Sequence, residues 1–279
     1  MNDNTFLQAI ANLPPIRDVI RDYKLGARKS LGQHFLHDLN LTARICRTAG
    51  SLKNYDILEI GPGPGGLTRA LLAAGAKKII AVERDTRCVA ALQDLVQLAN
   101  GRLEIIEEDA LKFDIENKIN SPCKVISNLP YNISTALIIR WLHNAHLFQS
   151  FTLMFQREVA ERIVATSGRN YGRLSVIAQL ICKVRLEFNV NRLAFNPPPS
   201  VDSSIITLIP TINKHNNIKL NDLESVTKLA FGQRRKMLRS SLRTLGIDLT
   251  KIDIDPTLRA ENLTIDQFCQ IATQIKNKF

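Results

Sequence analysis

Short apolar runs alternate with amphipathic stretches along much of the chain. Between residues 56 and 155, the runs with the composition of buried β-strands are Asp56–Ile60, Lys78–Glu83, Arg102–Glu107, Cys123–Ser127 and Ser150–Phe155. The stretches between them that have helical spacing are Gly66–Ala74, Thr86–Ala99 and Ser134–Asn144. Strands that alternate with helices in this way are typical of a parallel sheet with helical crossovers. The pattern therefore predicts an α/β domain.

Further elements flank this alternating region. Two extended runs, Val184–Val190 and Ser203–Ile209, follow one another closely, so we expect an antiparallel hairpin at one edge that completes the sheet. Leu7–Tyr23 has helical spacing interrupted by two prolines, and Asp38–Gly50 predicts another helix before the first strand. These elements extend the predicted α/β domain from residue 1 to about residue 210.

The composition changes after residue 210. Pro210–Asn217 is polar and rich in turn-forming residues, so it predicts a linker. Beyond it, helical spacing without any strand pattern recurs over Leu223–Phe231, Met237–Leu245 and Ile265–Ile275. We therefore predict two domains: residues 1–210, an α/β domain with an N-terminal helical extension, and residues 211–279, a small all-α domain.

Composition and charge narrow the possible classes of protein. Apolar residues make up 45% of the chain and charged residues 23%, which excludes disorder as the main state. Lys and Arg number 37 against 26 Asp and Glu, and the net charge of +11 favours a polyanionic partner such as RNA, DNA or an anionic membrane. The five cysteines are widely spaced, so we expect neither disulfides nor a metal site. With no signal pattern and no membrane-spanning run, we expect a soluble, cytoplasmic protein.

A glycine-rich loop follows the first strand of the alternating region. Residues 61–66 read Gly-Pro-Gly-Pro-Gly-Gly and lead into a helix, and glycines allow the backbone to turn sharply and approach a ligand closely. The same residues satisfy Gly-x-Gly-x-x-Gly, so a nicotinamide or flavin dinucleotide is one candidate ligand. Pro62 and Pro64, however, remove N–H donors that a pyrophosphate would use, which favours S-adenosylmethionine.

Two acidic residues at the ends of the following strands support a nucleoside ligand. Glu83 ends the second strand, 22 positions after Gly61, where its carboxylate can accept hydrogen bonds from both ribose hydroxyls. Asp109 follows the third strand and can accept from an adenine amino group. A solvated carboxylate in the run Glu83–Asp85 is the simpler alternative, but the regular placement at successive strand ends favours binding.

The fourth strand ends in the motif Asn128–Tyr131, of sequence Asn-Leu-Pro-Tyr. Ligand sites of α/β sheets form at the carboxyl ends of strands, where this turn lies. The Asn128 side-chain oxygen and the Leu129 carbonyl can accept from the two hydrogens of an adenine amino group, with Pro130 fixing the backbone. Tyr131 offers a flat face for an unstacked base. An ordinary strand-to-helix turn is the alternative for this motif.

Four motifs in order carry a resemblance to a known family. They are Gly32–Leu36, Glu59–Gly65, Asn128–Tyr131 and Phe195–Ser203. With them, and with Phe231–Lys236 in the helical tail, the whole chain resembles the rRNA adenine N6,N6-dimethyltransferases. The resemblance implies a Rossmann-like class I methyltransferase domain with a mostly parallel seven-stranded sheet, followed by a small all-α domain. The nearest branch is similar to the bacterial enzymes that dimethylate two adjacent adenosines in the 3′-terminal hairpin of 16S rRNA during small-subunit biogenesis.

The resemblance also implies site residues. The implied cofactor contacts are His34, Leu36, Gly61, Gly63, Glu83, Asp109 and Asn128, with S-adenosylmethionine as cofactor and S-adenosylhomocysteine as product. Phe195 would be a second aromatic against the target base, opposite Tyr131; a core phenylalanine beside a turn is the other interpretation. Many family members have Asn where this chain has His34, and we assign the His34 side chain no catalytic role.

The tail contains a basic run that predicts contact with nucleic-acid phosphates. Residues 231–243 contain no acid, and the candidate RNA-binding residues are Arg234, Arg235, Lys236 and Arg239. The expected partner is 16S rRNA within the small ribosomal subunit or its precursor, and we expect a monomer. Alternatives are dimethylation of large-subunit rRNA, as in macrolide resistance, a non-catalytic RNA-binding assembly factor and, more remotely, a dehydrogenase.

Overall fold

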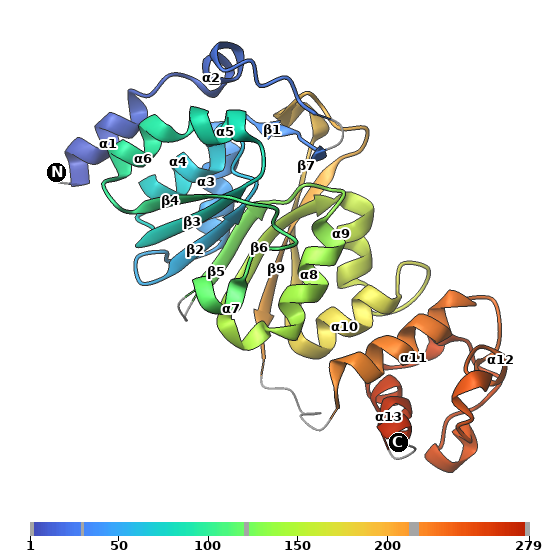
Figure 1. The fold of residues 1–279 in the computed structure, drawn as a ribbon. Coiled ribbons are helices and arrows are strands. Elements are labelled where there is room, and N and C mark those ends of the chain that lie inside the picture. The colour runs from blue at the N-terminus through green and yellow to red at the C-terminus, as the bar shows by residue number, and fades with distance from the viewer. Residues whose placement is uncertain (1–2, 29–30, 120–122, 212–217, 277–279) are drawn as a thin grey trace. The chain divides into compact units, whose positions relative to one another are not determined.

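The fold is built around a seven-stranded sheet. A computed structural model describes residues 3–28, 31–119, 123–211 and 218–276. The strands run in the spatial order β4-β3-β2-β5-β6-β9-β7 (Figure 1). Their bounds are β2 Asp56–Ile60, β3 Lys78–Glu83, β4 Leu103–Glu107, β5 Cys123–Asn128, β6 Phe148–Gln156, β7 Cys182–Val190 and β9 Ser203–Pro210. The pairs β4·β3, β3·β2, β2·β5 and β5·β6 are parallel and β6·β9 is antiparallel, which confirms the expected fold class.

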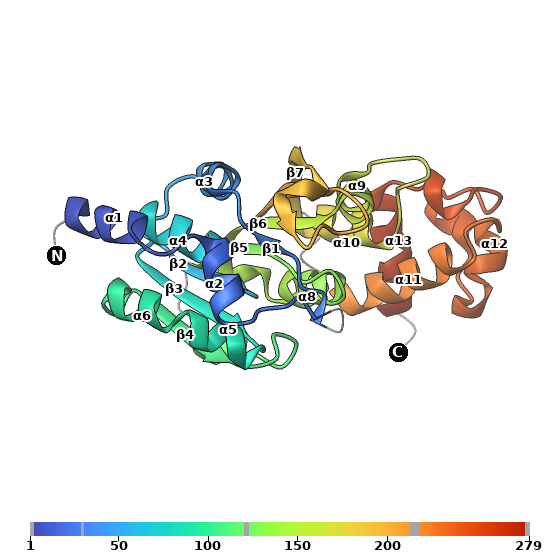
Figure 2. The same ribbon diagram turned by 90° about the horizontal axis from the view of Figure 1, so that it is seen from above.

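Most helices of the N-terminal part lie where the spacing of apolar residues predicts them, whereas the short helix Ile115–Lys118 was not predicted. Those of the N-terminal part are α1 Asp3–Ala11, α2 Ile16–Asp22, α3 Leu39–Thr48, α4 Gly66–Ala73, α5 Thr86–Ala91, α6 Gln93–Ala99, α7 Ile115–Lys118 and α8 Ser134–His143. Side chains from α1, α3, α4 and α6 join the strands in one apolar core, and Figure 2 shows α1, α4 and α6 grouped near β2, β3 and β4. The helix predicted over 86–99 is interrupted at Leu92 and forms two helices, with the Leu92 side chain buried in the core.

A two-stranded sheet escaped the sequence analysis. β1 (Phe35–Leu36) pairs antiparallel with β8 (Phe195–Asn196), and Leu36 lies opposite Phe195. Two residues are too few for a strand period to be visible in the sequence. The pairing ties the segment before α3 to the connection between β7 and β9, which brings two of the recognised motifs together.

The chain divides into two compact units. The first consists of residues up to Ile138, Asn144–Ala160 and Arg185–Ile209, and the second of Ile139–His143, Glu161–Val184 and the chain from Pro210 onward. The second unit contains α10 Arg173–Ile181, α11 Leu220–Gly232, α12 Leu238–Ser241 and α13 Ile265–Lys276, while α9 Arg157–Val164 spans the division.

The second unit thus takes in residues 161–184, which the sequence analysis placed in the first domain. The reason is apolar packing, since Val176 and Leu180 of α10 share one core with Leu223 and Phe268 of the tail helices. Residues 212–217 of the expected linker lie outside the described residues. Within the described residues, no helix is both long and apolar enough to cross a membrane.

Gly66 provides a test of how tightly β1 packs on α4. A Cβ at this position would lie 2.6 Å from the Leu36 carbonyl oxygen, which is backbone and cannot turn aside. We predict that Gly66→Ala lowers the free energy of unfolding by about 1–3 kcal/mol, because the β1 backbone must shift. Thermal melting measures the change. Gly232→Ala is the control, since no described atom outside its own helix turn lies within 4 Å of a Cβ there, and equal melting temperatures for the two variants would contradict the packing argument.

Candidate active site

A cavity of about 130 Å³ opens at the carboxyl ends of the central parallel strands, in the first unit. Its wall is made by residues 31–35, Ile60, Gly61, Gly63, residues 82–84, 108–111 and 128–133. Most of the site residues expected from the sequence lie in this wall: His34, Gly61, Gly63, Glu83, Asp109, Asn128, Leu129, Pro130 and Tyr131. Leu36 and Phe195 do not belong to it.

The glycine loop and the Asn-Leu-Pro-Tyr motif face each other directly. A Cβ at Gly61, whose φ is +66°, would lie 3.3 Å from the Pro130 ring, so glycine allows the two loops to touch. One position before the motif, the Ser127 hydroxyl donates to the Ile60 carbonyl at 2.7 Å. This bond holds the ends of β2 and β5 together beyond the last paired residues of the two strands. The two motifs that the sequence analysis singled out therefore share one cavity.

The Asn128 side chain has a fixed orientation. Its Nδ2 donates to the His34 carbonyl oxygen at 3.1 Å. A backbone carbonyl only accepts, so the amide nitrogen must face it and Oδ1 is turned away from His34. Among the described residues, no hydrogen bond to Asn128 Oδ1 is found. Asn128 thus lies in the cavity wall with the orientation of its amide fixed by His34.

Tyr131 is half-buried and held at both ends. Its hydroxyl shares a hydrogen bond of 2.5 Å with Ser203 Oγ on β9, and burial raises its pKa. Its ring centroid lies 5.5 Å from that of His34, with the ring planes at 32°. His34 Nδ1 in turn donates to the Pro197 carbonyl at 2.9 Å, since that oxygen can only accept. Contacts from both sides thus fix the Tyr131 ring in the cavity wall.

Phe195 does not line this cavity. Only 2% of its surface is exposed, and the side chain packs in the apolar core with Ile45 and Leu67. The pairing of β8 with β1 turns the ring into this core, so the aromatic ring next to Tyr131 is that of His34. Leu36 is also buried, and it borders a second, smaller cavity beside the glycine loop.

The two acids expected to bind a nucleoside both lie in the wall. Glu83 is buried, with Oε2 accepting from the Gly63 N–H at 3.1 Å and Oε1 from the Asp85 N–H at 2.8 Å. Burial raises the pKa of Glu83, and each oxygen can accept a further hydrogen bond. Asp109 is half-buried and accepts from Arg84 at 3.2 Å.

Glu59 is a site residue that the sequence analysis missed. It is 1% exposed, its Oε2 has no hydrogen-bond partner, and it borders the smaller cavity of about 20 Å³ together with Gly61 and Asn128. Burial raises its pKa to about 8. A buried carboxyl with an unpaired oxygen beside a cavity suits a ligand that carries a cationic group. The available signal was an acid in an otherwise apolar strand end immediately before the glycine loop.

The basic run of the tail lies in the second unit, and its candidate residues differ in their contacts and exposure. The Arg234 guanidinium donates to the carbonyls of Tyr171 at 2.8 Å and Gly168 at 3.1 Å, and pairs with Glu261 at 3.3 Å. It therefore ties parts of this unit together. The other three candidates, Arg235, Lys236 and Arg239, are exposed.

The raised pKa of Glu59 predicts a pH-dependent stability. The unfolded carboxyl ionises near pH 4.5, whereas the folded one keeps its proton to about pH 8, so Glu59 makes the protein less stable as pH rises between these values. Gln cannot ionise. We predict that the melting temperature of Glu59→Gln minus that of the unmodified protein increases by several degrees between pH 5 and pH 8. Thermal melts of both proteins at the two pH values measure this difference. A difference that does not change with pH would show that Glu59 is ionised in the folded protein.

Comparison with known proteins identifies the family. Residues 25–277 match the family model described as ribosomal RNA adenine dimethylase. The chain is 52% identical to ribosomal RNA small subunit methyltransferase A of Paramagnetospirillum magneticum, covering 94% of this chain and 95% of the relative, and 51% identical to the protein of that name from Rhizobium johnstonii, covering 96% and 100%.

Solved structures agree with these sequence matches. A dimethyladenosine transferase from Plasmodium falciparum has a TM-score of 0.77 at 29% identity, covering 88% of this chain and 98% of that one. The 23S rRNA methyltransferase ErmE has a TM-score of 0.66 at 25% identity, covering 87% and 99%. The matches span nearly the whole chain and include every motif of the cavity wall. The chain belongs to the ribosomal RNA adenine dimethylase family.

Proposed function

We propose that this protein transfers methyl groups from S-adenosylmethionine to N6 of two adjacent adenosines in the 3′-terminal hairpin of 16S rRNA. The products are N6,N6-dimethyladenosine and S-adenosylhomocysteine. The observation that carries the proposal is the Asn128 amide, which the His34 carbonyl orients in the wall that also contains the glycine loop. This arrangement combines an acceptor for an amino group with a loop that can approach a second ligand closely.

The donors and acceptors of the cavity fit the cofactor. When bound, S-adenosylmethionine supplies a methyl group on a positively charged sulfur. The Glu83 carboxyl would accept from the ribose hydroxyls, and Asp109 from the adenine amino group. Glu59, whose buried Oε2 is unpaired, would bind the ammonium group of the amino-acid end. The methyl group is already activated by the sulfonium, so the reaction needs no metal ion.

The Asn128–Tyr131 motif would act on the target adenine. Asn128 Oδ1 and the Leu129 carbonyl accept from the two N6 hydrogens and draw the nitrogen out of conjugation with the ring. The N6 lone pair then forms the new N–C bond as the C–S bond breaks, its electron pair stays on sulfur, and one N6 proton leaves to water. Orientation supplies most of the rate enhancement in such a transfer.

The target base would stack on Tyr131. Contacts between a base and an aromatic side chain are worth about 1–3 kcal/mol per base. The hydrogen bond to Ser203 and the neighbouring His34 ring keep the Tyr131 ring from rotating away. The base can therefore be received on a surface that is already ordered, which lowers the entropy lost on binding.

The relatives favour the small-subunit branch over large-subunit rRNA. Identity is 51–52% to proteins named small subunit methyltransferase A and 25% to the 23S rRNA methyltransferase. We accordingly propose 16S rRNA in the small subunit or its precursor as the partner, a role in small-subunit biogenesis, a monomer and a cytoplasmic location. An assembly factor without activity would have no need of an oriented Asn128 in this cavity.

The direct test is incubation with labelled S-adenosylmethionine and small-subunit particles that lack these methyl groups. We expect label on the two adjacent adenosines of the 3′-terminal hairpin, as dimethyladenosine in digests. Fully methylated particles and large subunits are the controls and should remain unlabelled. Label in large-subunit rRNA would support the alternative branch, and its absence from all particles would support a non-catalytic factor.

Asn128 and Tyr131 are predicted to contribute differently. Asn128→Ala should reduce methyl transfer by at least about a hundredfold, because an oriented acceptor is lost from the reacting centre. Tyr131→Ala should lower transfer with little loss of affinity for S-adenosylhomocysteine, because its ring faces the base. Single-turnover assays and calorimetry measure these effects, with melting temperatures as the folding control. Near-normal turnover by Asn128→Ala would refute the acceptor assignment.

The exposed tail residues are predicted to contact rRNA phosphates. Replacing Arg235, Lys236 and Arg239 by Ala should weaken binding to small-subunit particles and flatten the dependence of log K on log salt by about 2–3, since each lost phosphate contact reduces the slope by about 0.7–0.9. Binding measured between 50 and 200 mM salt tests this. Arg234 stays in place because its loss would disturb internal contacts, and an unchanged slope would exclude these residues as phosphate contacts.

A further inference from the structure

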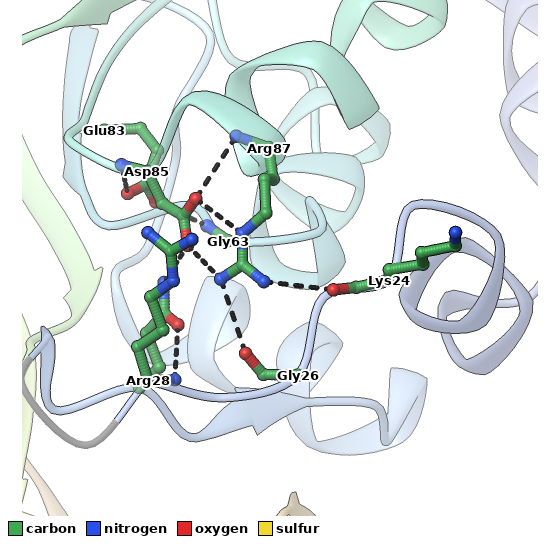
Figure 3. A network of polar contacts seen from close by, with 8 residues as sticks. Lys24, Gly26, Arg28, Gly63, Glu83, Asp85 and Arg87 are labelled. Atoms are coloured by element: carbon green, nitrogen blue, oxygen red, sulfur yellow. Dashed lines mark hydrogen bonds and ion pairs between the residues drawn. The ribbon is translucent and has the colours of Figure 1, made fainter.

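The segment that carries His34 is held by a second set of contacts outside the cavity wall (Figure 3). Arg87, at the start of α5, donates to the Lys24 carbonyl at 3.0 Å and to the Gly26 carbonyl at 3.3 Å. Both acceptors are backbone atoms of the connection between α2 and β1, more than sixty positions away in the sequence. The guanidinium therefore holds the backbone at Lys24 and Gly26 rather than a side chain of this connection.

Asp85 accepts hydrogen bonds from Arg87 and from Gln33, and these two residues lie at or contact opposite ends of the same connection. Its side chain is fully buried, and Oδ2 accepts from Arg87 at 2.6 Å and from Gln33 Nε2 at 2.9 Å. Oδ1 accepts from Arg87 Nε at 3.0 Å, which makes the pair bidentate. Gln33 Oε1 then accepts from the Arg28 N–H at 3.0 Å. We call Asp85, Arg87 and Gln33 the Asp85 clasp.

The charge state of the clasp is constant over the working range of pH. The hydrogen bond from Arg87 and a further one from Gln33 lower the pKa of Asp85 to about 2. The carboxylate is thus ionised whenever the protein is folded under ordinary conditions. The contacts between the clasp and the connection to β1 persist across that range.

The clasp is linked to the reacting groups on two sides. Gln33 directly precedes His34, whose carbonyl orients the Asn128 amide. On the other side, the Asp85 N–H donates to Glu83 Oε1 at 2.8 Å. Gln33 belongs to the cavity wall, whereas Asp85 and Arg87 do not, so any influence of Asp85 and Arg87 on the reaction must act through Gln33, His34 and Glu83.

We propose that the Asp85 clasp is a set of positioning residues for methyl transfer: it fixes residues 33–34 so that the His34 carbonyl holds Asn128 Oδ1 towards the adenine amino group. The proposal rests on the function proposed above. Apolar contacts alone place this connection less exactly, because Phe35 packs against Gly63, Leu25 and Cys88 but forms no directional contact there. Arg87, held in its bidentate pair with Asp85, supplies directional contacts through its two hydrogen bonds to the Lys24 and Gly26 carbonyls.

Four variants separate a positioning role from a purely structural one. Arg87→Leu removes every clasp contact of the guanidinium. Arg87→Lys keeps a positive charge beside Asp85 but cannot form the bidentate pair. Gln33→Leu leaves the Asp85–Arg87 pair intact and remains informative if Arg87→Leu does not fold. Arg185→Leu is the matched control, because it breaks a bidentate pair with Glu187, at 2.8 and 2.9 Å, on β7 away from the cavity wall.

The measurements are kcat and KM for methyl transfer to unmethylated small-subunit particles. Titration with S-adenosylhomocysteine determines the fraction of active sites in each variant. We expect kcat of Arg87→Leu and Gln33→Leu to fall on the order of tenfold or more, because a small misplacement of a reacting group has a large effect on rate. KM for the particles should not change, and Arg87→Lys should recover part of kcat. The double variant that combines Arg87→Leu with Gln33→Leu should lose no more kcat than Arg87→Leu alone, since both substitutions open one clasp.

The outcomes are distinct. Variants that melt earlier but keep kcat per active site would show that the clasp is only structural and would overturn the proposal. So would additive losses in the double variant, or an equal loss of kcat in Arg185→Leu. If the unmodified protein binds S-adenosylhomocysteine but methylates no particle, the proposed function fails instead, and the clasp is then left without a reaction to position.

Discussion

The hydrogen bond from the Asn128 amide to the His34 carbonyl is the interaction on which the site depends. It joins residues 94 positions apart and determines which atom of the amide faces His34. Its geometry requires that the connection before β1 lie in one place, and several independent features serve this requirement. β1 pairs with β8, Gly66 admits the Leu36 carbonyl, and Phe35 packs on Gly63. The proposed catalytic geometry thus depends on backbone packing as well as on the motif.

The distribution of charge follows the chemistry proposed for the two ligands. The chain has a net charge of +11, yet Glu59 and Glu83, both acids, are buried beside the glycine loop. Burial raises the pKa of each, which makes them costly for the empty fold and suited to a ligand with cationic and hydroxyl groups. Exposed cations such as Arg235 and Lys236 suit a polyanion. One protein can therefore bind a cationic cofactor inside and an anionic RNA outside.

The sequence predicts those parts of the fold and the site that are encoded locally. Strand composition, the glycine loop and Asn128–Tyr131 are contiguous, and parallel strands bring their carboxyl ends to one edge, so the shared cavity follows from topology. Contacts between distant segments could not be predicted in this way. The β1–β8 pair is too short to show a period, and without it the burial of Phe195 and the proximity of His34 to Tyr131 cannot be foreseen.

Contacts between distant segments also explain the other differences between the predictions from the sequence and the structure. Arg234 belongs to a basic run in the sequence, but carbonyls of Gly168 and Tyr171 accept its hydrogen bonds in the folded unit. Residues 161–184 precede the predicted linker, but the apolar side chains of α10 pack with the tail helices. The sequence shows that Glu59 lies close to the glycine loop. Its role is indicated only by the structure, in which its Oε2 is buried and unpaired. Charge and polarity in the sequence indicate which groups are available, whereas packing decides which of them are used.

The most direct measurement is a crystal structure with S-adenosylhomocysteine and adenosine bound together. We predict that Asn128 Nδ2 still donates to the His34 carbonyl, and that Asn128 Oδ1 and the Leu129 carbonyl both accept from the adenosine N6, which points at the sulfur. An Asn128 amide turned the other way, or an adenosine whose N6 contacts neither oxygen, would contradict it.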